Sequence, residues 1–178
     1  MSSKIVPSCK LILTACFNYT IRYILLCMAT NVKTVKIKSV QTIVLDELLN
    51  LALTTPEIHT QIGEPEYYSK KQLNGFIRNP DAIFLAAFIG KELVGFSLTT
   101  YDKFANEAYF VNMVIKDGYR RSGIGKKLYK QTLSKLSKTD CNWIWVLTEE
   151  ENKKMQSFLE KHDFERGPKF VYYRKSLN

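Results

Sequence analysis

The sequence has few of the residues that bind metals or build disulfide frameworks. Its 178 residues include only two histidines and four cysteines. Cys9, Cys16 and Cys27 lie near the N-terminus, and Cys141 stands alone in the rest of the chain. No spacing resembles a zinc site or a disulfide framework, so we expect no resident metal. Unpaired thiols are typical of a reducing compartment, which favours a cytoplasmic protein.

The sequence also lacks an uninterrupted apolar run. Its most apolar stretch, residues 10–30, contains Asn18 and Arg22, whereas a membrane-spanning helix needs about 20 consecutive apolar residues. A basic start followed by apolar residues resembles a signal peptide, but no clear cleavage site of small residues follows. We therefore expect no membrane association.

The same stretch sets the expected domain boundary. Residues 1–30 are interpreted as an N-terminal extension, either loosely packed or preceding a natural start at Met28. Residues 31–178 are interpreted as a single domain. The sequence contains no repeats, linkers or low-complexity segments, and its length suits one domain with a sizeable core.

Positive charge is plentiful, and it is unevenly distributed. The formal net charge is +9, and from Lys116 onward lysine and arginine outnumber aspartate and glutamate nearly two to one. The positive electrostatic potential produced by this charge attracts an anionic partner. Nucleic acid and a phosphate-bearing cofactor both fit, and charge alone does not separate them.

Hydrophobic periodicity alternates between that of strands and that of helices. A strand and two helices come first, then three strands, and then a helix, a strand, a helix and a closing strand. Strands are expected at residues 34–40, 82–90, 91–102, 107–116, 142–148 and 170–177, and helices at 44–55, 66–79, 126–138 and 151–162. This order predicts a mixed α/β fold, with parallel pairing of the two strands around the third helix.

The segment GYRRSGIGKKL, residues 118–128, is the most distinctive motif. A Walker loop requires Lys and Ser or Thr where Ile124 and Gly125 stand, and a dinucleotide fingerprint requires a third glycine where Leu128 stands. The physics still favours phosphate, because glycines let backbone N–H groups approach a ligand and the helix N-terminus attracts an anion. A glycine-rich turn with solvated basic residues is the alternative.

This loop and a segment downstream of it together resemble one protein family. Residues 120–125, RRSGIG, fit the [RQ]-x-x-G-x-[GA] signature of the GNAT superfamily of acyl-CoA-dependent N-acetyltransferases. Downstream, residues 151–166, ENKKMQSFLEKHDFER, are similar to the family's asparagine, helix and FY-x-K-x-GF segment. The resemblance covers roughly residues 35–174.

The resemblance implies a GNAT-like fold, with about six to seven strands in a central mixed sheet and about four flanking helices. It implies acetyl-CoA as co-substrate, with its pyrophosphate held by the backbone N–H groups of residues 121–126 and its arm along the strand before the loop. A main-chain N–H near Val114 would polarise the thioester carbonyl. The implied cofactor contacts are Met113, Val114, Ile115, Arg120, Arg121, Ser122, Gly123, Ile124, Gly125, Lys126, Asn152 and Phe158.

The resemblance also implies a primary amine as acceptor: a protein N-terminus, a lysine or a small amine. An alkyl amine is mostly protonated near pH 7, so a carboxylate or a water relay must remove its proton. Glu107 is our first candidate for this base and Asp102 the second, and Tyr109 shares the face of Glu107. Acidic residues in the segment 54–71, among them Glu57, also suit a cationic acceptor.

Two positions depart from the family pattern. Leu159 stands where the family has the tyrosine that protonates the departing thiolate, and Asp163 stands where it has a glycine. We assign no general acid, since Tyr172, Tyr173 and solvent are all candidates. A GNAT-like module that binds acyl-CoA without turnover is therefore an alternative function, and a basic nucleic-acid-binding protein is another. A homodimer stays open, because the sequence does not decide the oligomeric state.

Overall fold

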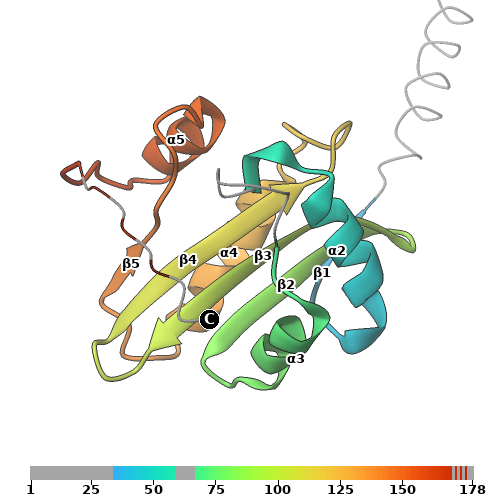
Figure 1. Cartoon of the computed structure of the whole chain (residues 1–178), viewed down its shortest axis with the longest axis horizontal. Coiled ribbons are helices and arrows are strands. Elements are labelled where there is room, and N and C mark those ends of the chain that lie inside the picture. Colours follow the sequence, from blue (N-terminus) through green and yellow to red (C-terminus); the bar gives the residue numbers. More distant parts are fainter. Residues whose placement is uncertain (1–33, 59–66, 170, 172, 174, 176–178) are drawn as a thin grey trace, which may run out of the picture.

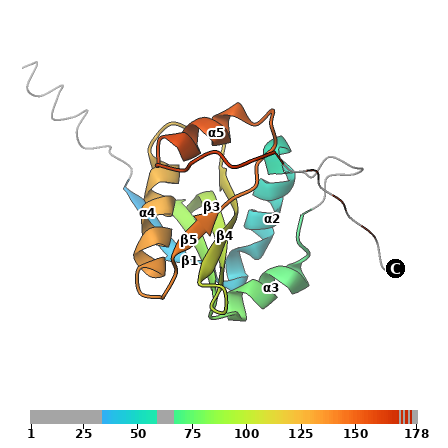
Figure 2. The same cartoon turned by 90° about the vertical axis from the view of Figure 1, so that its left-hand side faces the viewer.

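The computed structural model describes residues 34–58 and 67–169, together with 171, 173 and 175. A five-stranded sheet, in the order β1-β2-β3-β4-β5, lies between two layers of helices (Figures 1 and 2). Neighbouring strands are antiparallel except for β4 and β5, which are parallel. The strands are β1 (Val35–Ser39), β2 (Ala82–Ile89), β3 (Glu92–Asp102), β4 (Glu107–Ile115) and β5 (Trp143–Trp145), and the helices are α2 (Leu45–Leu53), α3 (Lys70–Arg78), α4 (Ile124–Leu136) and α5 (Lys153–Glu160).

This arrangement confirms the mixed α/β fold with four helices and corrects the number of strands. Five strands are present in the described part of the chain, where six to seven were expected. Of the expected closing strand, Val171, Tyr173 and Lys175 belong to no strand, and the other positions lie outside the described residues. β5 is only three residues long, so it offers a short ladder to a further strand. The expected extension at residues 1–30 also lies outside the described residues.

One layer consists of α2 and α3. Leu45, Leu48 and Ala52 form the buried stripe of α2, as its periodicity predicts. α3 begins at a capping box between Ser69 and Gln72. Both helices cover the part of the sheet around β2 and β3 together with Val114 of β4, and leave the same face of β5 and of the first residues of β4 without a helix (Figure 1).

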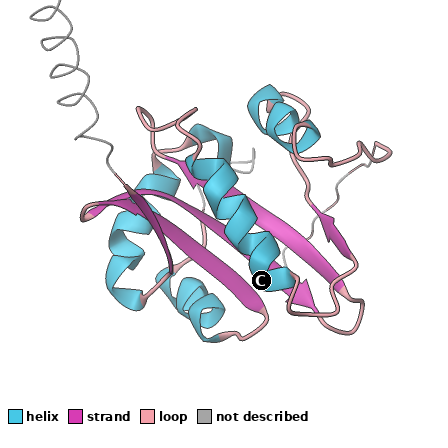
Figure 3. Ribbon diagram, turned by 180° about the vertical axis from the view of Figure 1, so that it is seen from behind, coloured by secondary structure: helices cyan, strands magenta, loops and turns pink. Residues whose placement is uncertain are grey.

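The other layer is α4, which crosses the opposite face of the sheet (Figure 3). Ile124, Leu128, Tyr129, Thr132 and Leu136 are buried against it. These residues form one stripe along the helix, which starts at Ile124 in the first turn. Leu133 lies outside this stripe and is exposed.

A β-bulge divides β4 into two halves. Leu98 pairs with Asn112 and the next residue, Thr99, pairs with Phe110, so Val111 is the extra residue. Before the bulge, the side chain of Phe110 faces α4 and contacts Tyr129. After it, Met113 faces α4 while Asn112 lies on the face of α2 and α3, where it contacts Tyr67.

β4 and β5 part soon after they meet. Their parallel register runs only from Glu107 opposite Trp143 to Tyr109 opposite Trp145. The rest of β4, through Ile115, pairs on its other side with β3 alone. The backbone groups that point away from β3 over this length therefore face a gap between the two strands, which we call the β4–β5 gap.

Candidate active site

The loop after β4 leads into α4 through two residues with left-handed backbone. Gly123, the N-cap of α4, has φ 82° and offers no side-chain cap, and Arg121 has φ 61°. The first N–H groups of a helix have no intrahelical partner, and those of α4 follow directly on Gly123. The loop expected to hold a pyrophosphate therefore does end in an uncapped helix N-terminus beside the β4–β5 gap.

Gly125 brings three predicted site residues together. A Cβ atom on Gly125 would lie 3.2 Å from Met113 Cε and 3.5 Å from Phe158 Cε2. The first turn of α4 therefore packs closely against β4 and α5 at once. This close approach is a reason for glycine at position 125 that the family signature alone does not give.

The side chain of Arg120 is directed at protein partners. Its Nη1 and Nη2 donate to the Glu57 carboxylate at 2.7 and 3.2 Å, and its Nε donates to the Ile115 carbonyl at 3.2 Å. Asp117 Oδ1 lies 2.9 Å from Nε. Arg121, Ser122 and Lys126 are exposed, so their side chains are accessible from solvent at the start of α4.

Glu57, from the short 3₁₀ helix η2 (Pro56–Ile58), also contacts α5. Lys154 Nζ donates to Glu57 Oε1 at 3.2 Å. The hydrogen bonds from Arg120, and secondarily that from Lys154, lower the pKa of the Glu57 carboxyl to about 2. Glu57 was expected to attract a cationic acceptor, and its carboxylate is instead engaged by these two basic side chains.

Asn152 and Phe158 are placed by α5. Asn152 is the N-cap of the helix, and its Oδ1 accepts a hydrogen bond from the backbone N–H of Met155 at 3.1 Å. Phe158 packs edge-on against Tyr129 and His162, and the His162 ring stacks on Tyr129 at 5.1 Å. This aromatic cluster joins α5 to α4 through Tyr129, which is also part of the buried stripe of α4.

The two departures from the family pattern have different local settings. Leu159 is buried, with 7% of its surface exposed. Asp163, just after α5, has φ 63°, a backbone conformation in which glycine is favoured and aspartate is tolerated. The structure thus explains the family's glycine at this position as a helix-terminating residue.

The face of β4 and β5 without a helix carries Glu107, Tyr109, Trp143 and Trp145. Tyr109 and Trp145 stack with ring centroids 4.4 Å apart. Trp143 is 72% exposed and Trp145 45% exposed. We call Tyr109, Trp143 and Trp145 the aromatic platform. The sequence analysis missed the two tryptophans, although their i, i+2 spacing in a strand places them on one face.

Beyond the platform, Asn112 lies on the same face just after the bulge. Its Nδ2 donates to the Tyr67 hydroxyl at 3.0 Å. Burial raises the pKa of the Tyr67 hydroxyl well above its ordinary value, so the group stays protonated near neutral pH. The Asn112 Oδ1 atom is buried and has no hydrogen-bond partner among the described residues. The sequence pattern contained no indication of this pair, which joins positions 45 residues apart.

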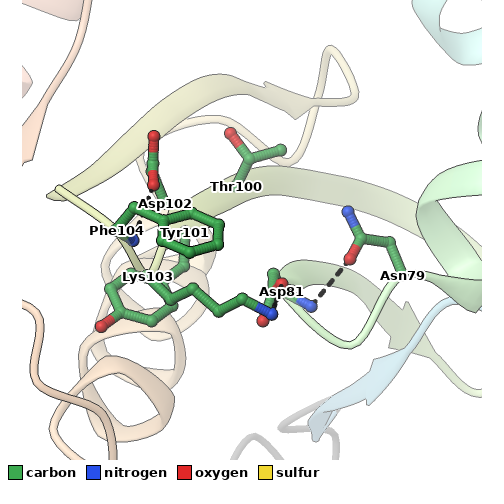
Figure 4. Close-up of a pocket in the computed structure, with 7 residues that line it drawn as sticks. All are labelled: Asn79, Asp81, Thr100, Tyr101, Asp102, Lys103 and Phe104. Atoms are coloured by element: carbon green, nitrogen blue, oxygen red, sulfur yellow. Dashed lines mark hydrogen bonds and ion pairs between the residues drawn. The ribbon is translucent and has the colours of Figure 1, made fainter. Parts of the chain in front are cut away.

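Asp102, the second candidate base, is the last residue of β3, before the turn to β4. Its Oδ1 accepts hydrogen bonds from the backbone N–H groups of Phe104 and Ala105 at 2.9 and 3.2 Å. It lines a pocket of about 300 Å³ with Asp81 and Lys103, at the opposite end of β4 from Gly123 (Figure 4). Asp102 therefore closes the hairpin, and Glu107 is opposite it in the strand register.

Within residues 34–58 and 67–169, no three His, Cys, Asp or Glu side chains are placed to hold a metal ion. In the same part of the chain no helix has the length and apolarity to cross a membrane. Cys141 is partly buried, and its Sγ lies 3.2 Å from the Trp143 carbonyl oxygen.

A mixed sheet whose fifth strand parts from the fourth beside a glycine-opened helix is an architecture of N-acetyltransferases. The chain belongs to the acetyltransferase (GNAT) family, whose model matches residues 45–164. It is therefore an acetyltransferase, as the resemblance implied. The match supports neither a nucleic-acid-binding protein nor a silent acyl-CoA-binding module.

Solved structures agree with this family. PaiA N-acetyltransferase from Thermoplasma acidophilum, in complex with coenzyme A, is 25% identical, with a TM-score of 0.66, over 74% of this chain and 90% of that one. An aminoglycoside 6′-N-acetyltransferase from Acinetobacter baumannii is 16% identical, with a TM-score of 0.65, over 82% of this chain and 100% of that one. A search of curated proteins gives no match.

Proposed function

We propose that this protein transfers the acetyl group of acetyl-CoA to a primary amine by direct attack within a ternary complex. The observation that carries the proposal is the β4–β5 gap, which opens after Tyr109 and leads to the uncapped N-terminus of α4. A gap bordered by strand backbone that is not paired with β5 accepts an extended arm with amide groups, and the helix N-terminus accepts its phosphates.

The backbone of β4 offers hydrogen bonds to such an arm at alternate residues. Lys116 N donates to Val94 O on β3, and Val114 O would lie 2.7 Å from a Cβ on Gly95, also on β3. By the alternation of a strand, Met113 and Ile115 then point their N–H groups into the gap. We therefore assign the N–H that polarises the thioester carbonyl to Met113 or Ile115, the neighbours of Val114.

The residues around α4 suit the phosphates of acetyl-CoA. Glycine at 123 and 125 exposes the N–H groups of the first turn, and no Cβ at these positions blocks a close approach. Arg121 and Lys126 add exposed positive charge. Acetyl-CoA supplies an activated acetyl thioester, and the chain supplies its position.

Transfer requires two proton movements. The amine nitrogen forms a bond to the acetyl carbon, the carbon–sulfur bond breaks, the amine loses a proton and the thiolate gains one. We propose Glu107 as the base that receives the amine proton. It lies about 26 Å along β4 from Ile115 and about 20 Å from Met113, taking roughly 3.3 Å per residue. The proton therefore reaches Glu107 only along a chain of several waters that passes Tyr109. Leu159 has no proton to give, so the thiolate takes its proton from solvent or from Tyr172 or Tyr173.

The acceptor reaches the gap from the face that carries the aromatic platform. An amine carrying apolar or additional cationic groups gains contact with exposed tryptophan rings there. The acceptor is a protein N-terminus, a lysine or a small amine. The related structures include a ribosomal-protein-alanine N-acetyltransferase from Brucella melitensis as well as aminoglycoside acetyltransferases, so they do not choose among these.

Calorimetric titration with acetyl-CoA tests the proposal. We expect binding by the wild-type protein, loss of binding in Gly125→Val, and unchanged binding in Lys135→Glu, which is on α4 away from its first turn. Absence of wild-type binding at millimolar acetyl-CoA contradicts the proposal. Release of free CoA on addition of an amine library then detects turnover, and Glu107→Gln should lower it with little change in acetyl-CoA affinity.

A further inference from the structure

Two segments of the chain border the β4–β5 gap beyond the paired part of the strands. β4 continues into the loop that carries Arg120, and β5 continues toward α5, which carries Lys154. The Glu57 carboxylate contacts both of these side chains, at 2.7 and 3.2 Å for Arg120 and at 3.2 Å for Lys154. We call Glu57, Arg120 and Lys154 the Glu57 bridge. Along the chain, Glu57 is 63 positions from Arg120 and 97 positions from Lys154.

We propose that Glu57 is a positioning residue for acetyl-CoA, because its bridge fixes the two borders of the gap relative to each other on the α2 side. The inference rests on the proposed function, since it concerns the same gap. It adds a residue from η2, outside the signature loop and outside α5, to those that set the geometry of cofactor binding.

The opposite side of the gap is joined by apolar packing. There Phe158 of α5 lies against the first turn of α4 at Gly125 and edge-on to Tyr129. The end of the gap is joined by the three-residue ladder that stops at Tyr109. The Glu57 bridge is made of side-chain ion pairs, so it is the contact across the gap that one substitution removes without disturbing the core.

The geometry of the Glu57 bridge indicates that its ion pairs contribute measurably to holding the two borders of the gap. The side chains of Arg120 and Glu57 are only 29% and 32% exposed, and two guanidinium nitrogens donate to the two carboxylate oxygens. Such paired, charge-assisted contacts are stronger than single exposed ion pairs. Lys154 is 77% exposed and makes one contact, so its share is smaller.

The bridge also defines what Arg120 does. Its guanidinium is engaged by Glu57, Asp117 and the Ile115 carbonyl oxygen, so it holds the end of β4 and the start of the loop. The charge that meets the phosphates then comes from exposed residues such as Arg121 and Lys126. Arg120 acts on the cofactor through the position of the loop.

Glu57→Gln tests the inference, because it keeps the size of the side chain and removes the charge. We expect the Kd and the KM for acetyl-CoA to rise about fivefold, as the loss of a partly buried pair implies. CoA should dissociate faster, while kcat at saturating acetyl-CoA and the KM for the amine stay unchanged. The matched control is Glu150→Gln, which removes an exposed pair with Lys169 and should leave all of these values unchanged.

A double-mutant cycle keeps the test independent of folding defects. Lys154→Gln, at an exposed site, should weaken acetyl-CoA binding less than Glu57→Gln, and the double variant should bind no more weakly than Glu57→Gln alone. Lys153→Gln is the control for position on α5.

The outcomes separate the inference from the proposed function. If the wild-type protein fails to bind acetyl-CoA, the proposed function fails. If the wild-type protein binds and neither Glu57→Gln nor Lys154→Gln differs from its control, the positioning role of Glu57 fails. A fall in kcat, or a rise only in the KM for the amine, also overturns it, because Glu57 would then act on the acceptor side.

Discussion

Glycine residues occupy this fold for different physical reasons. A Cβ on Gly95 of β3 would lie 2.7 Å from the Val114 carbonyl oxygen, closer than real Cβ atoms come to a backbone atom. A Cβ on Gly75, inside α3, would meet nothing within 4 Å. Gly95 therefore allows β3 and β4 to approach each other, while Gly75 only adds conformational freedom to the unfolded chain.

The same substitution at these two glycines should have opposite effects on stability. Gly75→Ala should raise the free energy of unfolding by about 0.5–1 kcal/mol, because alanine is the better helix former. Gly95→Ala should lower it by about 1–3 kcal/mol through overpacking. Urea unfolding of both variants, with the wild type alongside, measures the two changes, and equal values would contradict the assignment.

Asp163 gives a second prediction at the scale of one residue. Its φ of 63° costs an L-residue about 1–2 kcal/mol, and glycine avoids most of this cost at the expense of a more flexible unfolded chain. Asp163→Gly should therefore stabilise the protein by up to about 1 kcal/mol. Thermal unfolding measures it, with Asp140→Gly, at a position of ordinary φ, as the control that should gain nothing.

At the scale of elements, two parts of β4 have different roles. The part that pairs with β5 carries the aromatic platform, and the part that does not pair with β5 borders the gap. Trp145→Ala should therefore raise the KM for the amine about fivefold, since a tryptophan contact with a cation or an apolar group is lost. The Kd for acetyl-CoA should stay the same.

The control for Trp145 is Phe104→Ala. Phe104 is 91% exposed, against 45% for Trp145, and lies in the turn between β3 and β4, so it is a more accessible aromatic residue outside the platform. Steady-state kinetics with one amine compare the two variants. Equal effects on the KM for the amine would show that the platform does not bind the acceptor.

The Glu57 bridge connects η2, the loop after β4 and α5, and it makes the stability of this region depend on pH. The pKa of the Glu57 carboxyl is lowered from 4.5 to about 2, mainly by its hydrogen bonds with Arg120. A carboxyl whose pKa is lowered by folding stabilises the folded state at pH values above its pKa in the unfolded chain. This contribution is lost as the pH falls toward the pKa of about 2 in the folded protein.

The difference in unfolding free energy between wild type and Glu57→Gln should therefore be constant between about pH 5 and pH 8 and shrink below about pH 4.5. Urea unfolding at several pH values measures this difference. A difference that grows on acidification would mean that the carboxyl is not ionised in the folded protein.

For the whole molecule, charge predicts how the protein meets its co-substrate. The net charge of +9 is concentrated after Lys116, and exposed basic residues lie at the N-terminus of α4. Salt screens such long-range attraction, so a tenfold increase in ionic strength should weaken acetyl-CoA binding several-fold, mainly through slower association. Lys126→Gln should reduce this salt dependence, and Lys135→Gln should not.

What the sequence predicts and what it leaves out follow from the range of the interactions concerned. The order of strands and helices and the loop at residues 120–125 depend on local patterns, and the structure contains them where expected. The contact between Glu57 and Arg120, the bulge at Val111 and the stacking of Tyr109 on Trp145 depend on pairing between distant segments. No local pattern specifies these. The expected closing strand is a similar case, because its pairing depends on the length of β5, and its described residues Val171, Tyr173 and Lys175 belong to no strand.

The bulge at Val111 shifts the alternation of side chains along β4 by one residue. A prediction of which face each side chain occupies, made by simple alternation from one end of the strand, is therefore correct on one side of Val111 and inverted on the other. Deleting Val111 while keeping the cofactor half in place would turn Glu107 and Tyr109 from the acceptor face to the face of α4, and would expose Phe110. One extra residue therefore keeps Glu107 and Tyr109 on the acceptor face while Met113 to Ile115 keep their orientation toward the cofactor. Insertions or deletions between residues 110 and 112 should be far more damaging than substitutions there.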